Sequence, residues 1–579
     1  MNIRAQLESR ISQALTVAVG ADSPAIVQPS ANPTFGDYQA NGVMAAAKRA
    51  KRNPRELATQ VMETLNLSDL ADSVEIAGPG FINITLNPAV LAEAVMRADE
   101  DARLDVPAVG AGQTVVVDYS SPNLAKEMHV GHLRSTIIGD SLARVLAFLG
   151  CNVIRQSHVG DWGTQFGMLI AFFAEQREKG IGDLSIADME AFYRQAKKRF
   201  DEDAAFADRA RLTVVKLQGG DPKVNADWRE ILNQSLAHCR EVYDLLGVSL
   251  TDADVRGESA YNDDLPVIVT DLKKAELLSE SEGAQCVFLD DDAFRGPEGE
   301  PVPVIVQKSD GGYLYATTDL AAMRYRGQTL GATRILYLTD ARQAFHFAQV
   351  FAVARAAGFV GEAVSLEHVP FGVMLNAEGR PFKTREGGTV KLADLLNEAV
   401  ERAATVVAEK NRDLPADQAA AVARAVGIGA VKYADLSMDR TSDYKFSWER
   451  MLSLQGNTAP YMQYAYARVQ SIFRKGAETI GDLAGKPVIL AEPAEKELAK
   501  RLGRFEEVLA AVATENRPNI LTGYLYDLAQ AFSGFYETCP VLKADDDATR
   551  ASRLRLCDVT ARTIRQGLEL LGIEVIEQM

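Results

Sequence analysis

The chain has 579 residues, a formal net charge of −17 and 47% hydrophobic residues. This length allows several domains with ample cores, and the acidic balance argues against a general nucleic-acid binder, although a specific RNA partner needs only a local basic surface. The sequence contains no long uncharged apolar run that could span a bilayer, and its five scattered cysteines indicate reduced thiols in a cytoplasmic protein, not a disulfide framework or a metal site.

The first block of the chain predicts a folded domain that ends near residues 105–112, a stretch containing proline and glycine. Its first apolar residues recur at helical spacing, which favours an amphipathic helix over a signal or transit peptide: Ile3, Leu7, Ile11 and Leu15. Basic residues gather at residues 48–55 and again at 496–504. On charge pattern alone each cluster is more typical of a solvated helix face than of an RNA contact.

The next segment, residues 115–154, predicts a βαβ unit. Residues 115–117 form an apolar β-branched run typical of a buried strand, and apolar residues then repeat at helical spacing as far as Gly150. Residues 151–154 resume an apolar run and indicate a second strand. In such units ligands bind beyond the carboxyl ends of the strands.

The loop between the first strand and the helix carries groups that suit a phosphate. Such a loop directs backbone N–H groups and the positive end of a helix to one point. Gly131 lets a ligand approach the backbone, His129 and His132 each offer a ring N–H, and Lys126 adds a charge. A lone pair of histidines is otherwise an ordinary helix start. Zinc would need further ligands, and no arrangement suggests a covalent nucleophile.

Beyond this unit the sequence predicts an interrupted α/β sheet followed by helices. A long, acidic, irregular stretch from about Gly180 to Gly312 breaks the βα rhythm and is interpreted as an insertion. The rhythm resumes with an apolar strand at residues 335–338, an amphipathic helix around 345–356 and a strand at 365–369. From about residue 455 to the last residue the pattern is wholly helical.

Several of these segments resemble arginyl-tRNA synthetases, a family of class I aminoacyl-tRNA synthetases. Residues 120–136, Ser-Ser-Pro-Asn-Leu-Ala-Lys-Glu-Met-His-Val-Gly-His-Leu-Arg-Ser-Thr, are similar to that family's version of the His-Ile-Gly-His signature. Residues 33–39 and 78–83 are similar to its N-terminal domain, and residues 457–468 and 567–573 to its helical anticodon-binding domain. The resemblance covers nearly the whole chain, in order.

The resemblance implies a multidomain α/β protein. It places an α+β tRNA-elbow (D-loop) binding domain at residues 1–107 and a doubly wound, parallel, Rossmann-like nucleotide-binding catalytic domain at 108–405, with an insertion at about 180–312. A connecting helical stem is expected at 406–454 and an all-α anticodon-binding domain at 455–579.

The activity that the resemblance implies is ATP-dependent ligation of L-arginine to its cognate tRNA through an arginyl-adenylate, with release of AMP and pyrophosphate. ATP enters as a substrate with Mg²⁺. We expect no tightly bound cofactor, no resident metal and no membrane partner, and a monomer in the cytoplasm. Members of the family characteristically bind tRNA before they activate the amino acid.

An arginine site needs a carboxylate for the planar guanidinium, because bidentate pairing distinguishes it from lysine. The resemblance assigns arginine binding to Asp118, Ser121, Asn123, Tyr315, Asp319 and Gln343. Asn123 and Gln343 would hold the amino-acid backbone, and Tyr315 and Asp319 would shape the side-chain pocket. Asp118 stands where some relatives have glutamate. Taken singly, each acidic residue is more often a cap or an ion-pair partner.

The resemblance assigns ATP binding to Lys126, His129, Gly131, His132, Phe382 and Lys383, and catalysis to Lys126, His129, His132, Lys383 and Arg385. The second class I signature departs from its usual Lys-Met-Ser-Lys-Ser form. Residues 381–385 are Pro-Phe-Lys-Thr-Arg, so Thr384 replaces the lysine that normally helps neutralise the leaving pyrophosphate. Lys126 is the proposed substitute, while Lys383 and Arg385 remain candidates for triphosphate contact.

The expected tRNA contacts are Phe81, Asn83, Asn457, Tyr461, Tyr464 and Arg468. Phe81 and Asn83 would read a D-loop base by stacking and hydrogen bonding; the alternative is a core residue and a turn cap. The tyrosines supply faces for unstacked anticodon bases, although packing between helices is the commoner role for any one of them. Trp162, flanked by glycines in residues 160–167, either presents an aromatic ring near the pocket or is purely structural.

Three other functions rank below this one. A different nucleotidyltransferase of the same superfamily would not need the helical, tyrosine-rich tail. An inactive tRNA-binding scaffold would have lost His129, His132 or the pocket acids, and the sequence retains them. A class I synthetase for another amino acid would charge lysine or cysteine in place of arginine.

Overall fold

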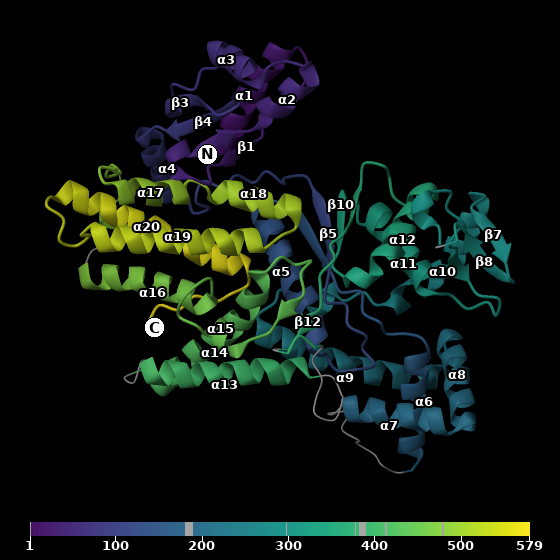
Figure 1. Ribbon diagram of the computed structural model, residues 1–579. Helices are drawn as coiled ribbons and strands as arrows, with labels where there is room; N and C mark the ends of the chain where they lie inside the picture. The colour runs from purple at the N-terminus through teal and green to yellow at the C-terminus, as the bar shows by residue number, and fades with distance from the viewer. Residues whose placement is uncertain are drawn as a thin grey trace. The chain divides into compact units, whose positions relative to one another are not determined.

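The computed structural model describes residues 2–179, 189–296, 298–376, 378–380, 390–410, 414–476, 480–483 and 485–578. The chain divides into two compact units, each drawn from separate parts of the sequence (Figure 1). One comprises Met1–Pro107, Leu454–Glu569 and Val575–Met579, and the other Ala108–Ser453 and Leu570–Glu574. Among the helices described, none is long and apolar enough to cross a membrane.

The second unit is built on a four-stranded parallel sheet with the strand order β11-β10-β5-β6. Its strands are β5 (Thr114–Asp118), β6 (Asn152–Gln156), β10 (Arg334–Tyr337) and β11 (Ser365–His368). β5 and β10 are neighbours although more than 200 residues separate them, and Asp118 pairs in register with Tyr337. The strand order reverses here, so the carboxyl ends of these strands form the expected ligand crevice.

Helix α5 (Leu133–Phe148) connects β5 to β6, and α12 (Ala344–Ala356) connects β10 to β11. The apolar residues of α5 repeat at helical spacing and are buried, and Gly150 follows its end with φ +91°. The buried valines of β5 lie at the centre of the sheet. These elements confirm the predicted βαβ unit and its return after the insertion.

The stretch from about Gly180 to Gly312 was expected to be irregular, and for its described residues that expectation is wrong. The chain between β6 and β10, which contains this stretch, is regular across its described part. It forms four long helices and a smaller layer of α10 (Leu265–Lys274), α11 (Tyr315–Arg324) and an antiparallel sheet with the order β7-β8-β9. The long helices are α6 (Thr164–Glu178), α7 (Met189–Glu202), α8 (Ala204–Gln218) and α9 (Pro222–Leu246), and the strands are β7 (Leu278–Ser281), β8 (Ala284–Val287) and β9 (Val304–Gln307). Frequent acidic residues obscured helices whose ends are capped by Asp203 and Asp221.

The remainder of this unit is mainly helical, with α13 (Leu392–Lys410), α14 (Ala416–Leu436), α15 (Trp448–Met451) and the short paired strands β12 (Met374–Leu375) and β13 (Tyr444–Lys445). Lys432 of α14 is fully buried and donates to the carbonyls of Leu246 and Gly572, 2.8 and 2.5 Å away. Burial lowers the pKa of Lys432 to about 8, against the attraction of Asp140 on α5. A side chain at Gly572 would collide with the Lys432 ammonium, so glycine is required there.

The first unit begins with a small α+β layer, an antiparallel sheet with the order β1-β2-β4-β3 flanked by helices. Its elements are α1 (Ile3–Val19), β1 (Val27–Pro29), β2 (Tyr38–Ala40), α2 (Gly42–Ala50), α3 (Pro54–Thr64), β3 (Ala71–Ala77), β4 (Phe81–Leu86) and α4 (Pro88–Glu100). The apolar residues Ile3, Leu7, Ile11 and Leu15 are buried on α1, which confirms the predicted amphipathic helix.

The rest of the first unit is helical: α16 (Ala459–Gly476), α17 (Pro493–Leu502), α18 (Phe505–Glu515), α19 (Asn519–Thr538) and α20 (Asp547–Leu570). Buried polar groups join these helices to the N-terminal layer. Arg555 of α20 forms an ion pair of 2.6 Å with Asp99 of α4, and Tyr38 donates to Glu507 of α18 at 2.9 Å. These contacts explain why two distant parts of the sequence form one compact unit.

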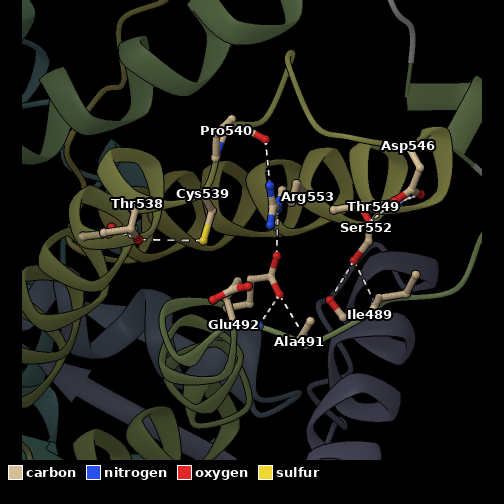
Figure 2. Close-up of polar contacts among 12 residues, drawn as sticks. Ile489, Ala491, Glu492, Thr538, Cys539, Pro540, Asp546, Thr549, Ser552 and Arg553 are labelled. Carbon is tan, nitrogen blue, oxygen red and sulfur yellow. Dashed lines mark hydrogen bonds and ion pairs between the residues drawn. The ribbon is translucent and has the colours of Figure 1, made fainter.

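Figure 2 shows a buried network of hydrogen bonds within this helical part. Arg553 of α20 donates to Glu495 of α17 at 2.7 Å and to the Pro540 carbonyl at 2.9 Å. The other oxygen of Glu495 accepts the N–H groups of Ala491 and Glu492, at 2.8 and 2.9 Å. Every oxygen of this carboxylate is therefore satisfied by the chain itself.

Together these layers give a multidomain α/β protein with a parallel catalytic-type sheet, an α+β N-terminal layer and a helical C-terminal part. The fold class predicted from the sequence is confirmed. All five cysteines are free thiols.

Candidate active site

A cavity of about 600 Å³ opens at the carboxyl ends of β5 and β10, where the sheet order reverses. It gathers residues from the β5–α5 loop, the segment after β6, the start of α11 and the start of α12. Its lining includes Asp118, Ser121, Asn123, Gly131, His132, Tyr315, Asp319 and Gln343. The structure thus brings together all six residues expected to bind arginine and two of those expected to bind ATP.

The histidine loop is held in place by its own hydrogen bonds. The Nδ1 atom of His132 accepts the His129 backbone N–H at 3.1 Å, and the Nδ1 atom of His129 accepts the Gly131 N–H at 3.0 Å. The two ring centroids lie 4.0 Å apart. A Cβ on Gly131 would lie 2.7 Å from the His129 ring, so glycine is needed for this geometry.

This arrangement determines how the histidines can act. Since each Nδ1 atom accepts a hydrogen bond, each neutral ring carries its proton on Nε2. Burial lowers the pKa of His132 to about 3, and burial also lowers the pKa of His129. Both rings are therefore neutral at pH 7 and act as hydrogen-bond donors, not as cations. Such donors, fixed in advance, suit charge that develops on a phosphate.

Asp118 lines the cavity but is already engaged. Its Oδ2 atom forms an ion pair of 2.8 Å with Arg326, a residue that is only 1% exposed. Its Oδ1 atom accepts from the Ser121 hydroxyl at 2.8 Å. Asp118 therefore connects Arg326 to Ser121 at the base of the cavity. Because Arg326 largely neutralises the charge of Asp118, this carboxylate would attract a cationic substrate only weakly.

Ser120 and Ser121 connect β5 to the histidine loop through a strained turn. Their φ angles are +67° and +42°, a region that residues other than glycine rarely adopt. The strain is held by hydrogen bonds, since the Ser120 N–H donates to the Ser135 hydroxyl and the His158 N–H donates to the Ser121 hydroxyl. This turn aims Asn123 and the loop at the cavity.

Among the acidic residues that line the cavity, Asp319 and Glu258 have the negative charges that neighbouring cations neutralise least. The Nε2 atom of His346 donates to Asp319 Oδ2 at 2.6 Å, and His158 lies 3.9 Å from Oδ1. Glu258 has no ion pair within the described part of the chain. Burial, together with the neighbouring carboxylates of Asp161 and Asp319, raises the pKa of Glu258 to about 7.

Glu258, His158, His346 and Arg326 were not predicted as site residues. Glu258 and Arg326 stand in segments whose local pattern gives no signal of function, and only the three-dimensional fold brings them to the cavity. His346 follows the predicted site residue Gln343 by three positions, and a histidine so close to it was a usable signal.

Other predicted residues lie elsewhere. Lys126 and His129 are absent from the cavity lining, and the Lys126 ammonium lies 4.5 Å above the ring of Tyr193 on α7. Trp162 packs edge-on against Trp228 with centroids 5.9 Å apart and does not line the cavity. Phe382, Lys383 and Arg385 fall outside the described residues.

The residues expected to contact tRNA all lie in the first unit. Asn83 is buried on β4 and accepts from Gln39 at 2.8 Å, with half-buried Phe81 two residues before it. Tyr464 of α16 is 43% exposed, whereas the ring of Tyr461 packs against Tyr526. The Arg468 guanidinium lies 4.5 Å above the ring of Tyr536. Asn457 precedes α16 and is half-buried.

Three family models match the chain in the order of its layers. Residues 3–86 match the arginyl-tRNA synthetase N-terminal domain, residues 95–448 the catalytic domain of class I (R) tRNA synthetases, and residues 462–579 the DALR anticodon-binding domain. The chain belongs to the arginyl-tRNA synthetase family. The catalytic-domain match contains the whole cavity described above.

Full-length relatives agree with this assignment. An arginine–tRNA ligase of Cellvibrio japonicus is 60% identical, and one of Laribacter hongkongensis is 58% identical, each over the whole length of both chains. Among solved structures, the arginyl-tRNA synthetase of Plasmodium falciparum has a TM-score of 0.86 at 30% identity and covers 100% of this chain and 99% of its own. The Thermus thermophilus arginyl-tRNA synthetase has a TM-score of 0.83 at 26% identity, with both chains fully covered.

Proposed function

We propose that this chain ligates L-arginine to its cognate tRNA at the expense of ATP, through an arginyl-adenylate, and releases AMP and pyrophosphate. The observation that carries this proposal is one cavity, at the sheet reversal, in which incompletely neutralised acids lie near a histidine loop. The acids suit a guanidinium, and the loop suits a triphosphate.

The acidic residues of the cavity differ in whether an arginine side chain pairs with them. Asp118 is paired with Arg326, and Asp340 is paired with Arg342 at 2.7 Å. Asp319 and Glu258 face the cavity without an arginine or lysine partner within the described residues. A guanidinium is permanently charged and offers five N–H donors, so it fits two carboxylates better than an ammonium does. We assign Asp319 and Glu258 to the arginine side chain, with Tyr315 at the rim.

The amide groups of Asn123 and Gln343 would hold the amino and carboxylate groups of arginine at the mouth of the cavity, where both side chains are exposed. The carboxylate oxygen then attacks the α-phosphorus of ATP in line, and pyrophosphate leaves. Next, a terminal ribose hydroxyl of tRNA attacks the arginyl carbonyl, and AMP leaves. The protein contributes position and charge stabilisation to both steps.

The neutral Nε2–H donor of His132 would meet the charge that develops on the phosphates. His129 would orient His132 and Gly131 through its ring contact and its hydrogen bond. Lys126, Phe382, Lys383 and Arg385 would complete the triphosphate site, with Lys126 leaving the Tyr193 ring when ATP binds. A Mg²⁺ ion would accompany ATP as part of the substrate, held mainly by phosphate oxygens and water.

The tRNA partner would meet the first unit. We assign Phe81 and Asn83 to the tRNA elbow, and Asn457, Tyr461, Tyr464 and Arg468 to the anticodon side. Exposed Tyr464 offers a free ring face for stacking, which supports this assignment. We further propose the domain boundaries 1–107, 108–405, 406–454 and 455–579, a monomer, and a cytoplasmic location.

The test is aminoacylation of tRNA with radioactive arginine, lysine or cysteine, using the intact protein and His132→Ala. We expect arginine alone to be charged, and His132→Ala to lower kcat by at least about 100-fold, the usual loss when one fixed transition-state donor is removed. Charging of another amino acid, or equal rates for the two proteins, would contradict the proposal. Omission of tRNA from an ATP–pyrophosphate exchange assay should abolish exchange.

A further inference from the structure

The strongest contact to a proposed substrate-binding acid comes from a histidine that no part of the proposed function uses. His346, on the first turn of α12, places its Nε2 atom 2.6 Å from Asp319 Oδ2. A carboxylate can only accept, so this nitrogen carries the proton. The ring also packs edge-on against Phe347, with centroids 5.4 Å apart, which holds its plane.

The two oxygens of Asp319 are therefore unequal. Oδ2 is occupied by His346, whereas Oδ1 has His158 at 3.9 Å, beyond hydrogen-bond distance. The Asp319 side chain is 16% exposed and lines the cavity. One oxygen is thus fixed by the chain, and the other is turned to the space that a substrate would fill.

We propose that His346 is a positioning residue for arginine selection. Its Nε2–H fixes the Asp319 carboxylate so that Oδ1 faces the guanidinium. The inference rests on the proposed function, since it concerns the same amino-acid site. His346 itself contacts Asp319 and is not required to touch the reacting atoms.

Other charged and titratable groups share the cavity with His346. Asp319 and Tyr315 line it from α11, His158 from the segment after β6, and Glu258 from the turn Glu258–Asp264. Asp340 and Arg342 precede α12 and pair with each other. The pKa of Glu258 is raised to about 7, so a pH profile alone would not isolate the histidine. A comparison between variants at position 346 at one pH is therefore needed.

Three proteins test the proposal: the intact chain, His346→Leu, which removes the donor, and His346→Gln, which can place an N–H near the Nε2 position. A matched control is His238→Gln, because His238 lies on α9, contacts Gln234 and is not part of the cavity. Each is assayed for aminoacylation over a range of arginine and ATP concentrations, and its melting temperature is recorded.

We expect His346→Leu to raise the KM for arginine by about 10-fold or more, the usual effect of losing a hydrogen bond to a charged group, with the ATP KM and kcat changed less than about threefold. His346→Gln should restore the arginine KM at neutral pH to within about threefold of the intact protein.

The proposal is overturned if His346→Leu leaves the arginine KM unchanged. It is also overturned if His346→Leu impairs kcat, the ATP KM and the melting temperature along with the arginine KM, as the loss of a purely structural residue would. An arginine KM that stays raised in a well-folded His346→Gln would refute the role of the Nε2–H donor. An intact protein that fails to charge arginine would overturn the proposed function instead, so the two failures are distinguishable.

Discussion

Two carboxylates, a buried one in the first compact unit and a half-buried one in the second, use the same chemistry for different ends. Glu495 has both oxygens satisfied by Arg553, Ala491 and Glu492, and its side chain is 2% exposed. Asp319 has one oxygen held by His346 and the other turned to the cavity, and its side chain is 16% exposed. A carboxylate that the chain saturates stabilises the fold, whereas one left half-saturated is available to a cationic ligand.

Neutralisation of Asp319 tests the carboxylate that is available to a ligand, and it should have the largest effect of the changes considered. Loss of one member of a buried charge pair typically costs about 3–5 kcal/mol, so Asp319→Asn should lower kcat/KM for arginine by about 100- to 4000-fold. The ATP KM should change little. Glu495→Gln is the matched control, with an unchanged arginine KM. Steady-state aminoacylation at varied arginine measures both, and a small effect at Asp319 would show that other groups bind the guanidinium.

Arg553→Met tests the carboxylate that stabilises the fold, because it removes the cation that pairs with Glu495. This change leaves Glu495 buried without its cation, so we expect the first unit to lose about 3 kcal/mol of stability. The double change Arg553→Met with Glu495→Leu should lose less, because no unpaired charge remains. Denaturant unfolding of both variants measures this. A decrease in arginine affinity in Arg553→Met, with stability retained, would contradict the division of roles.

Glu258 sharpens the comparison because its charge depends on pH. Its pKa is raised to about 7 by burial and by the nearby carboxylates of Asp161 and Asp319. Below that pH Glu258 is protonated and offers no charge, and above it the ionised form attracts the guanidinium. The arginine KM should therefore fall by about tenfold as pH rises from about 6 to 8, and Glu258→Gln should flatten much of that change. An equally steep profile in the variant would exclude Glu258 as the source.

The smallest expected effect concerns the histidine loop. In Gly131→Ala the added methyl group would lie 2.7 Å from the His129 ring, which must rotate away. Off-rotamer strain of this kind costs about 1 kcal/mol, so kcat should fall by about 3- to 10-fold with the arginine KM preserved. Single-turnover adenylate formation, with tRNA present, would show the loss directly. Full activity would mean that the ring has room to move without consequence.

Local patterns predicted a large part of the fold and of the site. The valine run at residues 115–117, the helical repeat of α5 and the long histidine signature are contiguous in the sequence, and the structure places them as a βαβ unit with His132 and Gly131 at the cavity. The irregularity expected for residues 180–312 was wrong because charged residues hide the periodicity of amphipathic helices such as α7 and α8.

What the sequence could not show is how charges pair across the fold. Asp118, Asp319 and Glu258 are all acidic residues, and the sequence alone does not distinguish them. In the structure Arg326 neutralises Asp118, His346 holds Asp319 and burial raises the pKa of Glu258. Their partners lie from 27 to more than 200 residues away along the chain. Local reasoning therefore found Asp118 and Asp319 without ranking them, and it missed Glu258.

The most direct measurement compares arginine with citrulline, which has nearly the same shape but an uncharged end group, as substrates for aminoacylation. If Asp319 and Glu258 select a guanidinium by charge, kcat/KM for citrulline should be lower by about 1000-fold or more, because its uncharged end would leave the acids unpaired. In Asp319→Asn that ratio should shrink markedly. Comparable charging of the two amino acids by the intact protein would contradict the account.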